Sequence, residues 1–129
     1  MRRGFEAHRR NMPYCMGTLY WQLNDSWPVV SWSSIDYYGN WKAMHYQAKR
    51  AFAPVLVDAI KEGDDLNIYV MSDKLEADKD VTLQLRLMDF DGKVLKKKEI
   101  KGEVPANAST LYHKEKYEGM TPNPRNTFL

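Results

Sequence analysis

The chain has 129 residues, 43% of them hydrophobic and 28% charged, and a formal net charge of +2 at pH 7. This is the length of one ordinary domain with a buried core, whereas a closed eight-stranded α/β barrel needs about twice as many residues. No run approaches the ~20 consecutive apolar residues of a membrane helix, and the small basic cluster Arg2, Arg3, Arg9 and Arg10 has no continuation along the chain, so neither a membrane protein nor a nucleic-acid-binding protein is expected.

The first predicted elements are a helix and a buried strand. Residues 3–11 are predicted to be the last turns of a helix that ends before Pro13, because a residue that precedes proline avoids helical backbone angles. The nearly continuous apolar run 15–23 is typical of a strand buried on both faces, as in a parallel barrel. We expect Cys15, the only cysteine, to lie in the core of this strand.

A long loop and a second helix follow that strand. Residues 24–39 are rich in Ser, Trp and Asp without a regular period, and Pro28 interrupts any ladder. Asn40 is a candidate N-cap for an amphipathic helix that runs to Phe52. Strand, loop and helix together form one βα unit. The apolar side of the helix is expected to carry Trp41, Met44, His45, Ala48 and Phe52, and the solvent side Lys42, Gln47, Lys49 and Arg50.

The sequence changes character after residue 53, where we place the boundary between two modules. Residues 54–62 are predicted to be a short strand or connector, and apolar residues then recur with a period of two over 66–71 and 81–88. That period is typical of antiparallel strands with one buried face. The exposed side of the first of these strands would consist of Asn67, Tyr69 and Met71.

A hairpin turn and an edge strand come next. The pair Asp91-Gly92 supplies the positive-φ residues of a tight turn, and residues 93–100 return as a lysine-rich strand. We interpret the three lysines at 96–98 as protection of a sheet edge against mispairing.

The remaining elements complete a β-rich second module. Another strand is predicted over 109–114, a loop with Pro122 and Pro124 over 119–126, and the start of a strand at Thr127. Four or five short strands with hairpin chemistry predict an immunoglobulin-type β-sandwich, for which about seven strands are usual. Residues 54–129 therefore indicate an incomplete sandwich, or one completed by another chain.

All four tryptophans, Trp21, Trp27, Trp32 and Trp41, lie in one stretch that runs from residue 21 to residue 41. A pyranose presents one face of C–H groups and an edge of hydroxyls, so its site combines a flat aromatic platform with short polar groups. This stretch supplies both, and it follows the C-terminal end of the predicted barrel strand, where α/β barrels place their sites. We therefore predict a sugar-binding rim.

Four residues of this rim are candidates for contact with a sugar. Trp21 is either a stacking platform at the strand end or a large core residue, and Trp27 would line the cleft. Asn24 and Asp25 would hydrogen-bond sugar hydroxyls or, alternatively, cap local turns through their own backbone. The other two tryptophans are expected to be packing residues.

The sequence contains no self-sufficient active site. Hydrolysis of a glycoside needs two carboxyl groups about 5 Å apart for retention and farther apart for inversion, but Asp25 and Asp36 lie on one loop without a rigid element to set their spacing. The histidines are scattered, so neither a metal site nor a cofactor is expected, and His45 is interpreted as a partly buried, hydrogen-bonded residue. The other two histidines are His8 and His113.

A dense set of motifs runs from residue 11 to residue 57. They are Met-Gly-Thr-Leu-Tyr-Trp-Gln-Leu-Asn-Asp at 16–25, Trp-Pro at 27–28, Ser-Trp-Ser-Ser at 31–34, Tyr-Tyr-Gly at 37–39 and Trp-Lys-Ala-Met-His-Tyr at 41–46. In order and spacing this set resembles the β-mannosidases of glycoside hydrolase family 2. Residues 58–129 resemble more loosely the sandwich that follows the barrel in that family.

The resemblance implies a domain organisation and an activity. Residues 1–53 would be the C-terminal end of the (β/α)8 catalytic domain, a TIM-type barrel, and residues 54–129 part of an immunoglobulin-like β-sandwich. The family comprises retaining enzymes that hydrolyse terminal non-reducing β-D-mannose residues from β-mannosides, and it suggests a periplasmic, secreted or lysosomal location. Its two catalytic glutamates stand on earlier barrel strands and have no counterpart here, because Glu6 lies in a predicted helix without the surrounding motif.

The chain alone is therefore expected to be inactive, and to contribute Trp21, Asn24, Asp25 and Trp27 to the subsite for a β-mannoside oligosaccharide. Two rival functions remain open: a stand-alone carbohydrate-binding β-sandwich module without catalysis, and a sandwich that acts purely in protein interaction. A single βα unit leaves strand edges unpaired, so we also expect self-association or rearrangement of residues 1–53.

Overall fold

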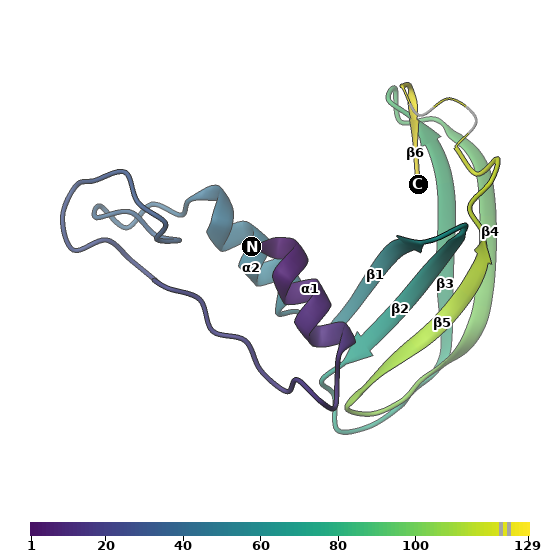
Figure 1. The fold of residues 1–129 in the computed structure, drawn as a ribbon, viewed down its shortest axis with the longest axis horizontal. Coiled ribbons are helices and arrows are strands. Elements are labelled where there is room, and N and C mark those ends of the chain that lie inside the picture. Colours follow the sequence, from purple (N-terminus) through teal and green to yellow (C-terminus); the bar gives the residue numbers. More distant parts are fainter. Residues whose placement is uncertain (122, 124) are drawn as a thin grey trace. The chain divides into compact units, whose positions relative to one another are not determined.

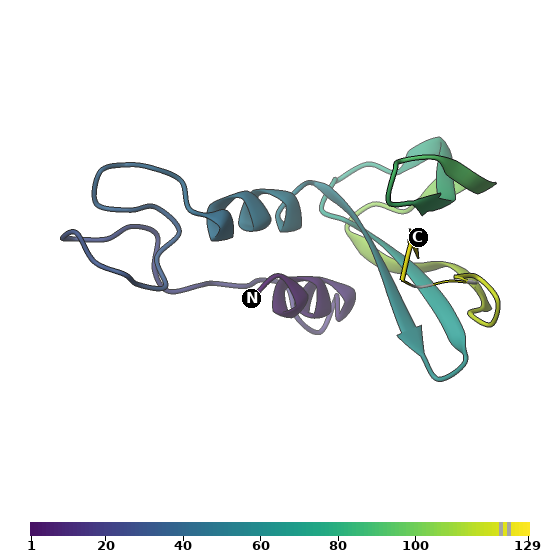
Figure 2. The same ribbon diagram turned by 90° about the horizontal axis from the view of Figure 1, so that it is seen from above.

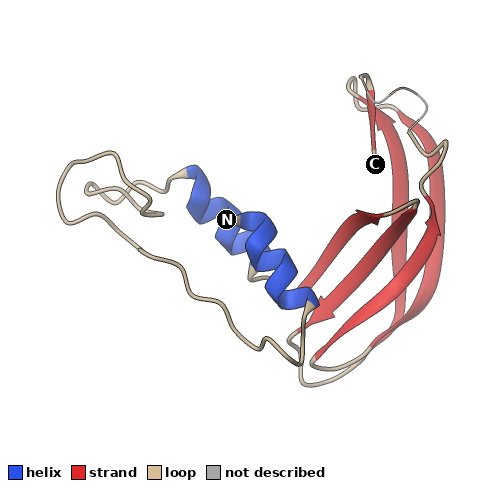
Figure 3. Cartoon of the chain, viewed as in Figure 1, coloured by secondary structure: helices blue, strands red, loops and turns tan. Residues whose placement is uncertain are grey.

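The computed structural model describes residues 1–121, 123 and 125–129, and the chain divides into two compact units (Figure 1). Unit 1 comprises Met1–Leu56 and unit 2 comprises Val57–Leu129. Two short helices and a long loop dominate unit 1, whereas unit 2 is built from strands (Figure 3).

The two helices of unit 1 pack against each other. They are α1 (Arg2–Arg10) and α2 (Ala43–Ala51), and they run side by side in both views (Figures 1 and 2). Phe5 is buried against Ala48 and Ala51, and its ring centroid lies 5.0 Å from that of Phe52. Small alanines on α2 let the two helices approach closely, so one large side chain fills the interface.

Arg9 joins α1 to the end of α2. Its Nη1 donates hydrogen bonds to the carbonyl oxygens of Ala51 and Ala53, each at 2.7 Å. The last carbonyls of a helix have no partner inside the helix, and a positive charge is favourable beside them. Because Arg9 is only 8% exposed, packing as well as hydrogen bonding fixes its position.

The helix predicted over residues 3–11 is confirmed, but the start of α2 was predicted too early. Lys42, not Asn40, occupies the N-cap position. Asn40 is held instead in a turn by Asp36, whose carboxylate accepts hydrogen bonds from the Asn40 backbone N–H at 2.8 Å and from its side-chain amide at 2.9 Å. A short polar side chain in such a turn competes with helix formation.

The structure contains no strand over residues 15–23, so this prediction is wrong for the chain by itself. The segment is irregular, Leu19 is 99% exposed, and Cys15 is only half-buried rather than in the core. A parallel strand exists only between hydrogen-bonded neighbours, and unit 1 offers none to this segment. The nearest ladder contacts are isolated bridges of Ile35 with Asn24 and with Trp41.

Within the described residues, unit 2 contains two three-stranded sheets, with the orders β1-β2-β5 and β4-β3-β6. The pairs β2/β5, β3/β4 and β3/β6 are antiparallel. This arrangement is consistent with a β-sandwich, and it confirms the antiparallel strands predicted in the second module. The strands are β1 (Val55–Glu62), β2 (Asp65–Ser72), β3 (Asp78–Asp89), β4 (Val94–Val104), β5 (Ala108–Lys116) and β6 (Thr127–Phe128).

Burial follows the predicted period of two in β3 but not in β2. Along β3 the even-numbered Thr82, Gln84 and Arg86 are exposed, and the apolar residues between them are half-buried. In β2, by contrast, Asn67 and Met71 are buried, although the sequence placed both on an exposed face. β2 is the middle strand of its sheet, between β1 and β5, and side chains on both of its faces are buried.

The hairpin between β3 and β4 is longer than the predicted two-residue turn. Gly92 has the expected positive φ, +86°, but Asp91 is not among the residues with positive φ. The connection is closed by Asp89, whose carboxylate accepts a hydrogen bond from the Lys93 N–H at 2.8 Å. The lysines at 96–98 are exposed on β4, which is an edge strand as predicted.

Polar side chains connect the two sheets of unit 2. Lys98 of β4 contacts Nε2 of His113 at 3.2 Å and forms an ion pair with Glu115, both on β5. The Tyr112 hydroxyl donates to the carbonyl oxygen of Val81 at 3.5 Å.

A loop was predicted over residues 119–126. Its two prolines, Pro122 and Pro124, lie outside the described residues.

Candidate functional site

The aromatic loop, residues 21–41, exposes its indole rings. Trp21 is 74% exposed and Trp27 is 68% exposed, so neither is a core residue of unit 1. Trp32, predicted to be a packing residue, is 64% exposed, and that prediction is wrong for this chain. Trp41, also predicted to be a packing residue, is 48% exposed, although its ring centroid lies 4.3 Å from that of His45. A platform for a flat apolar ligand is therefore available on this loop.

Backbone hydrogen bonds fold the aromatic loop back on itself. The N–H of Ile35 donates to the carbonyl oxygen of Leu23 at 2.8 Å, and the N–H of Asp25 donates to the carbonyl oxygen of Ile35 at 3.1 Å. The N–H of Lys42 donates to the carbonyl oxygen of Ser34 at 2.9 Å. These bonds bring the beginning and the end of the loop together, so the residues between them form one closed loop.

An ion pair between a buried aspartate and a half-buried lysine fixes the base of the aromatic loop. Lys42 Nζ lies 2.7 Å from Asp25 Oδ2 and 2.8 Å from Ser33 Oγ. Ser31 also donates its hydroxyl hydrogen to Asp25. Asp25 is 4% exposed and Ser33 is 1% exposed. We call Asp25, Ser31, Ser33 and Lys42 the Asp25 cluster.

The surroundings of Asp25 favour its charged form. The hydrogen bond from Lys42, followed by that from Ser31, lowers the pKa of the Asp25 carboxyl below its ordinary value, and burial opposes this only in part. Hydrogen bonds to the charged form of a carboxyl have this effect generally. The carboxylate is thus occupied by Ser31 of the loop and by Lys42, the residue that follows the loop.

Asn24 and Asp36 are also engaged locally. The Asn24 side chain is exposed, and its amide donates to the carbonyl oxygen of Asp25 at 3.2 Å. The Asp36 carboxylate accepts two hydrogen bonds from Asn40, and both lower the pKa of that carboxyl. The bond from the Asn40 side chain has the larger effect, and the bond from its backbone N–H comes second. Asp25 and Asp36 therefore belong to separate hydrogen-bond networks. The third acidic side chain of unit 1, Glu6, forms an ion pair with Arg2, with 2.6 Å between Glu6 Oε1 and Arg2 Nε.

Sequence reasoning missed the role of Lys42 and part of a second network. Lys42 was expected to face solvent, but its ammonium lies in the Asp25 cluster. The hydroxyl of Ser34 lies 2.8 Å from that of Tyr20 and 3.2 Å from Nδ1 of His45, which confirms His45 as a hydrogen-bonded, partly buried residue. A signal for Lys42 did exist, since it is the only Lys or Arg between Arg10 and Lys49 and lies near a loop aspartate.

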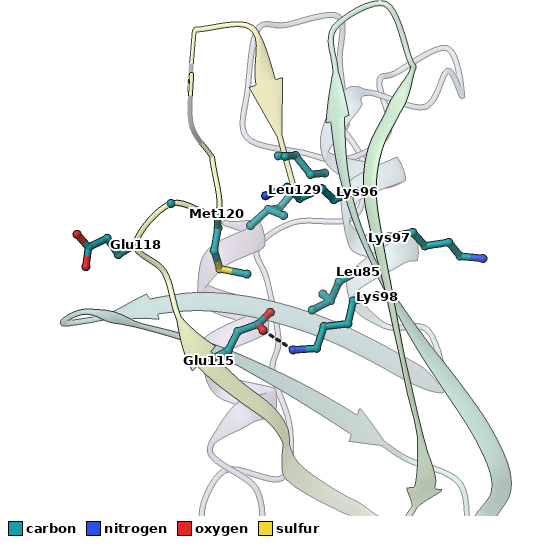
Figure 4. A pocket seen from close by; sticks show the side chains of 10 residues that line it. Leu85, Lys96, Lys97, Lys98, Glu115, Glu118, Met120 and Leu129 are labelled. Atoms are coloured by element: carbon teal, nitrogen blue, oxygen red, sulfur yellow. Dashed lines mark hydrogen bonds and ion pairs between the residues drawn. The ribbon is translucent and has the colours of Figure 1, made fainter.

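Unit 2 contains a separate pocket of about 440 Å³ between its sheets. Leu85, Leu87, Met120 and Leu129 supply apolar lining, and the ion pair of Lys98 with Glu115 lies at its side (Figure 4). No tryptophan lines this pocket, and no residue of the Asp25 cluster does. The pocket therefore lacks the aromatic platform that makes the aromatic loop a candidate sugar site.

The described part of the chain offers neither a metal-binding cluster nor a membrane-spanning helix. Among residues 1–121, 123 and 125–129, no group of three or more His, Cys, Asp or Glu side chains is arranged to hold a metal ion. None of the helices in the same residues is long and apolar enough to cross a membrane.

Comparison with known proteins matches both units. The family model described as Mannosidase Ig/CBM-like domain matches residues 64–129. Goat (Capra hircus) β-mannosidase is 49% identical over 74 residues, which are 57% of this chain and 8% of that protein. β-Mannosidase A of Aspergillus terreus is 34% identical over 122 residues, which are 88% of this chain and 13% of the relative.

A solved structure agrees with these relatives. The crystal structure of β-D-mannosidase from Dictyoglomus thermophilum superposes with a TM-score of 0.80 at 38% identity, over 91% of this chain and 14% of that one. The chain thus spans only a small part of the length of the proteins it matches. It belongs to the Mannosidase Ig/CBM-like domain family, and corresponds to a segment of the β-mannosidases.

Proposed function

We propose that the chain is the segment of a retaining β-mannosidase that joins the end of the catalytic barrel to an immunoglobulin-like domain. Residues 1–53 would supply the eighth strand, the active-site loop and the eighth helix of the (β/α)8 domain, and residues 54–129 part of the sandwich. Two relatives that align over most of the chain, at 34% and 38% identity, carry the name β-mannosidase, which supports this assignment. Hydrolysis of terminal β-D-mannose would belong to the whole enzyme.

One observation carries the proposal: two exposed indoles lie on a loop that is fixed from within. Trp21 and Trp27 are 74% and 68% exposed, although burial of aromatic rings is normally favourable. The Asp25 cluster holds the base of the same loop through the ion pair at 2.7 Å. A rigid loop that presents bare aromatic faces suits a sugar ring, because little conformational entropy is lost when the ligand binds.

The proposed sugar-contacting set is Trp21, Asn24, Asp25 and Trp27, with different roles. The indoles would stack on C–H faces of the sugar, and the exposed Asn24 amide would hydrogen-bond a hydroxyl. Asp25 would act mainly through the shape of the loop, since Lys42 and Ser31 already occupy its carboxylate.

The segment 15–23 fits a barrel strand that lacks its neighbours here. It is apolar and β-prone, yet Leu19 is 99% exposed and Leu23 is 56% exposed. Strands on both sides would bury these side chains and pair the backbone. This supports an origin in a parallel barrel over an origin in a self-contained module.

The alternative is a stand-alone carbohydrate-binding β-sandwich that uses the exposed indoles without catalysis. Titration of the 129-residue chain with mannose, methyl β-mannoside and mannobiose, followed by tryptophan fluorescence, separates the two. The proposal expects no saturable binding up to ~50 mM, well beyond ordinary specific affinities, and no release of nitrophenol from 4-nitrophenyl β-mannoside. Saturable binding favours the alternative, and turnover by the chain alone contradicts the proposal.

A second experiment tests the site itself in a complete β-mannosidase that carries this segment. Trp21→Ala should lower kcat/KM at least about fivefold, since an aromatic platform contributes on the order of 1 kcal/mol or more. Tyr14→Ala is a matched control, because this side chain is 91% exposed and lies outside the aromatic loop. Equal activity of the two variants would count against a platform at Trp21.

A further inference from the structure

Ser34 links the segment that carries Trp21 to α2. It is 0% exposed, and each of its polar groups is hydrogen-bonded. Its backbone N–H donates to the carbonyl oxygens of Gln22 at 3.2 Å and Leu23 at 3.1 Å. Its own carbonyl oxygen accepts from the N–H of Lys42, the N-cap residue of α2, at 2.9 Å. A single buried residue therefore connects the chain just after Trp21 with the start of a helix.

The hydroxyl group of Ser34 has three neighbours but only one hydrogen. Its Oγ lies 3.0 Å from the carbonyl oxygen of Leu23, 2.8 Å from the hydroxyl oxygen of Tyr20 and 3.2 Å from Nδ1 of His45. A carbonyl oxygen can only accept, so the Ser34 hydrogen goes to Leu23 and the other two neighbours donate to the Ser34 oxygen. Only this arrangement makes all three contacts hydrogen bonds. It gives His45 the tautomer with its hydrogen on Nδ1.

Both of these donors are anchored by the helix pair of unit 1. The ring of Tyr20 packs against the core between α1 and α2, and its centroid lies 5.9 Å from that of Phe5. His45 belongs to α2 itself, and its ring centroid lies 4.3 Å from that of Trp41. The packing of α1 against α2 thus fixes the two groups that hold the hydroxyl of Ser34.

We propose that Ser34 is the positioning residue of the Trp21 platform and acts through Tyr20 and His45. This role rests on the proposed function, in which Trp21 stacks on a sugar ring. The Ser34 hydroxyl accepts from the residue before Trp21, and the Ser34 N–H donates to the residue after it. The backbone at Trp21 is therefore held on both sides while its indole stays 74% exposed. A platform held in this way loses little mobility when a ligand binds.

The first test uses the 129-residue chain and needs no sugar. NMR spectra of the imidazole nitrogens, recorded at alkaline pH where the ring is neutral, should show the hydrogen of His45 on Nδ1. Ser34→Ala removes the acceptor and should shift the ring toward the form with its hydrogen on Nε2. The indole N–H of Trp21 should become more mobile, with a lower order parameter, in both Ser34→Ala and Tyr20→Phe.

Two exposed residues of the aromatic loop provide matched controls. Ser26→Ala repeats the loss of a serine hydroxyl, and Tyr38→Phe repeats the loss of a tyrosine hydroxyl, at exposed positions. Both should leave the imidazole and indole signals as in wild type. If Ser34→Ala resembles Ser26→Ala, or if wild-type His45 has its hydrogen on Nε2, the positioning role is overturned.

The second test measures the kinetics of a complete β-mannosidase that carries this segment. Ser34→Ala should lower kcat/KM about threefold or more, because it removes the hydrogen bonds of a buried hydroxyl. The effect should vanish in a Trp21→Ala background, since residues that act through the same group are not additive. His45→Asn, which places an amide donor near the position of Nδ1, should retain more activity than His45→Leu, which has no donor.

The kinetic results separate failure of the positioning role from failure of the proposed function. If Trp21→Ala leaves kcat/KM unchanged, the platform itself is absent and its positioning residue falls with it. If Trp21→Ala impairs the enzyme but Ser34→Ala does not, the platform stands and the role of Ser34 is overturned. Additive losses also overturn that role, because Ser34 would then act on the fold as a whole. If Ser34→Ala does not fold, Tyr20→Phe, which removes one donor only, decides in its place.

Discussion

Lys42 Nζ lies 2.7 Å from Asp25 Oδ2, and this contact joins the residue before α2 to the beginning of the aromatic loop. The Asp25 side chain is only 2% exposed, and that of Lys42 is 27% exposed. A carboxylate so deeply placed depends on its partner, because a charge without one is costly to bury. The ion pair is therefore a structural determinant of the loop that presents Trp21 and Trp27.

Replacement of Lys42 should loosen the aromatic loop. In Lys42→Met the Asp25 carboxylate and the Ser33 hydroxyl lose the ammonium that both contact. We expect greater quenching of tryptophan fluorescence by acrylamide and a lower urea midpoint for the fluorescence transition. All four tryptophans lie in unit 1, so the signal reports on that unit alone.

Two variants make the Lys42 experiment specific. Arg50→Met removes an exposed positive charge from the same helix and should leave the quenching unchanged. Lys42→Arg keeps the charge and should restore much of the wild-type behaviour. If Lys42→Met and Arg50→Met behave alike, the Asp25 cluster does not fix the loop.

Acid should weaken unit 1 through the same carboxylates. Neighbouring hydrogen bonds lower the pKa of both Asp25 and Asp36 in the folded chain. Carboxyls with a lowered folded pKa stabilise the fold at pH values above their ordinary pKa, about 3.9, and this stabilisation is lost as the pH falls through the lowered pKa. Tryptophan fluorescence should therefore show a reversible transition below about pH 4.

The acid transition should depend on which carboxylate is removed. Asp36→Asn should make it smaller, because one of the two contributing groups no longer titrates. Asp91→Asn, in the turn between β3 and β4, is the matched control and should leave the transition as in wild type, since unit 2 contains no tryptophan. A transition that is the same in all three proteins would show that other groups control it.

The core of unit 2 should be sensitive to the loss of a single side chain. Ile68 has 0% exposure in the middle strand of its sheet. Ile68→Ala should lower the free energy of unfolding by about 2–5 kcal/mol, because it combines lost burial with a cavity. Leu75→Ala is the control, since Leu75 is 88% exposed and its loss should change stability by no more than about 0.5 kcal/mol. Urea denaturation followed by circular dichroism measures both.

Elements stabilised by near neighbours in sequence were predictable. The helix that ends at Arg10 and the alternation along β3, with Leu83 half-buried and Gln84 exposed, follow from local periodicity. The edge position of β4 was also predictable, because a row of lysines at 96–98 is compatible only with a solvated strand.

Features that depend on distant neighbours were not predictable in the same way. Residues 15–23 have the composition of a buried strand, but pairing needs other strands, and none lies beside them in unit 1. The alternation along β2 predicts that Asn67 and Met71 lie on an exposed face, yet both are buried in this middle strand of the sheet. Within the candidate site, the indoles at Trp21 and Trp27 were recognisable from composition, whereas the ion pair of Asp25 with Lys42 spans 17 positions and has no periodic signature.

The guanidinium of Arg9 has a consequence for any shortened version of the polypeptide. It donates a hydrogen bond to the carbonyl oxygen of Ala51, 42 positions later in the chain, so α1 holds the end of α2 in place. Removal of the residues up to Arg9 would remove this hydrogen bond together with Phe5. It would leave α2 as an isolated nine-residue helix, shorter than the ~12–15 residues at which isolated helices become even marginally stable in water.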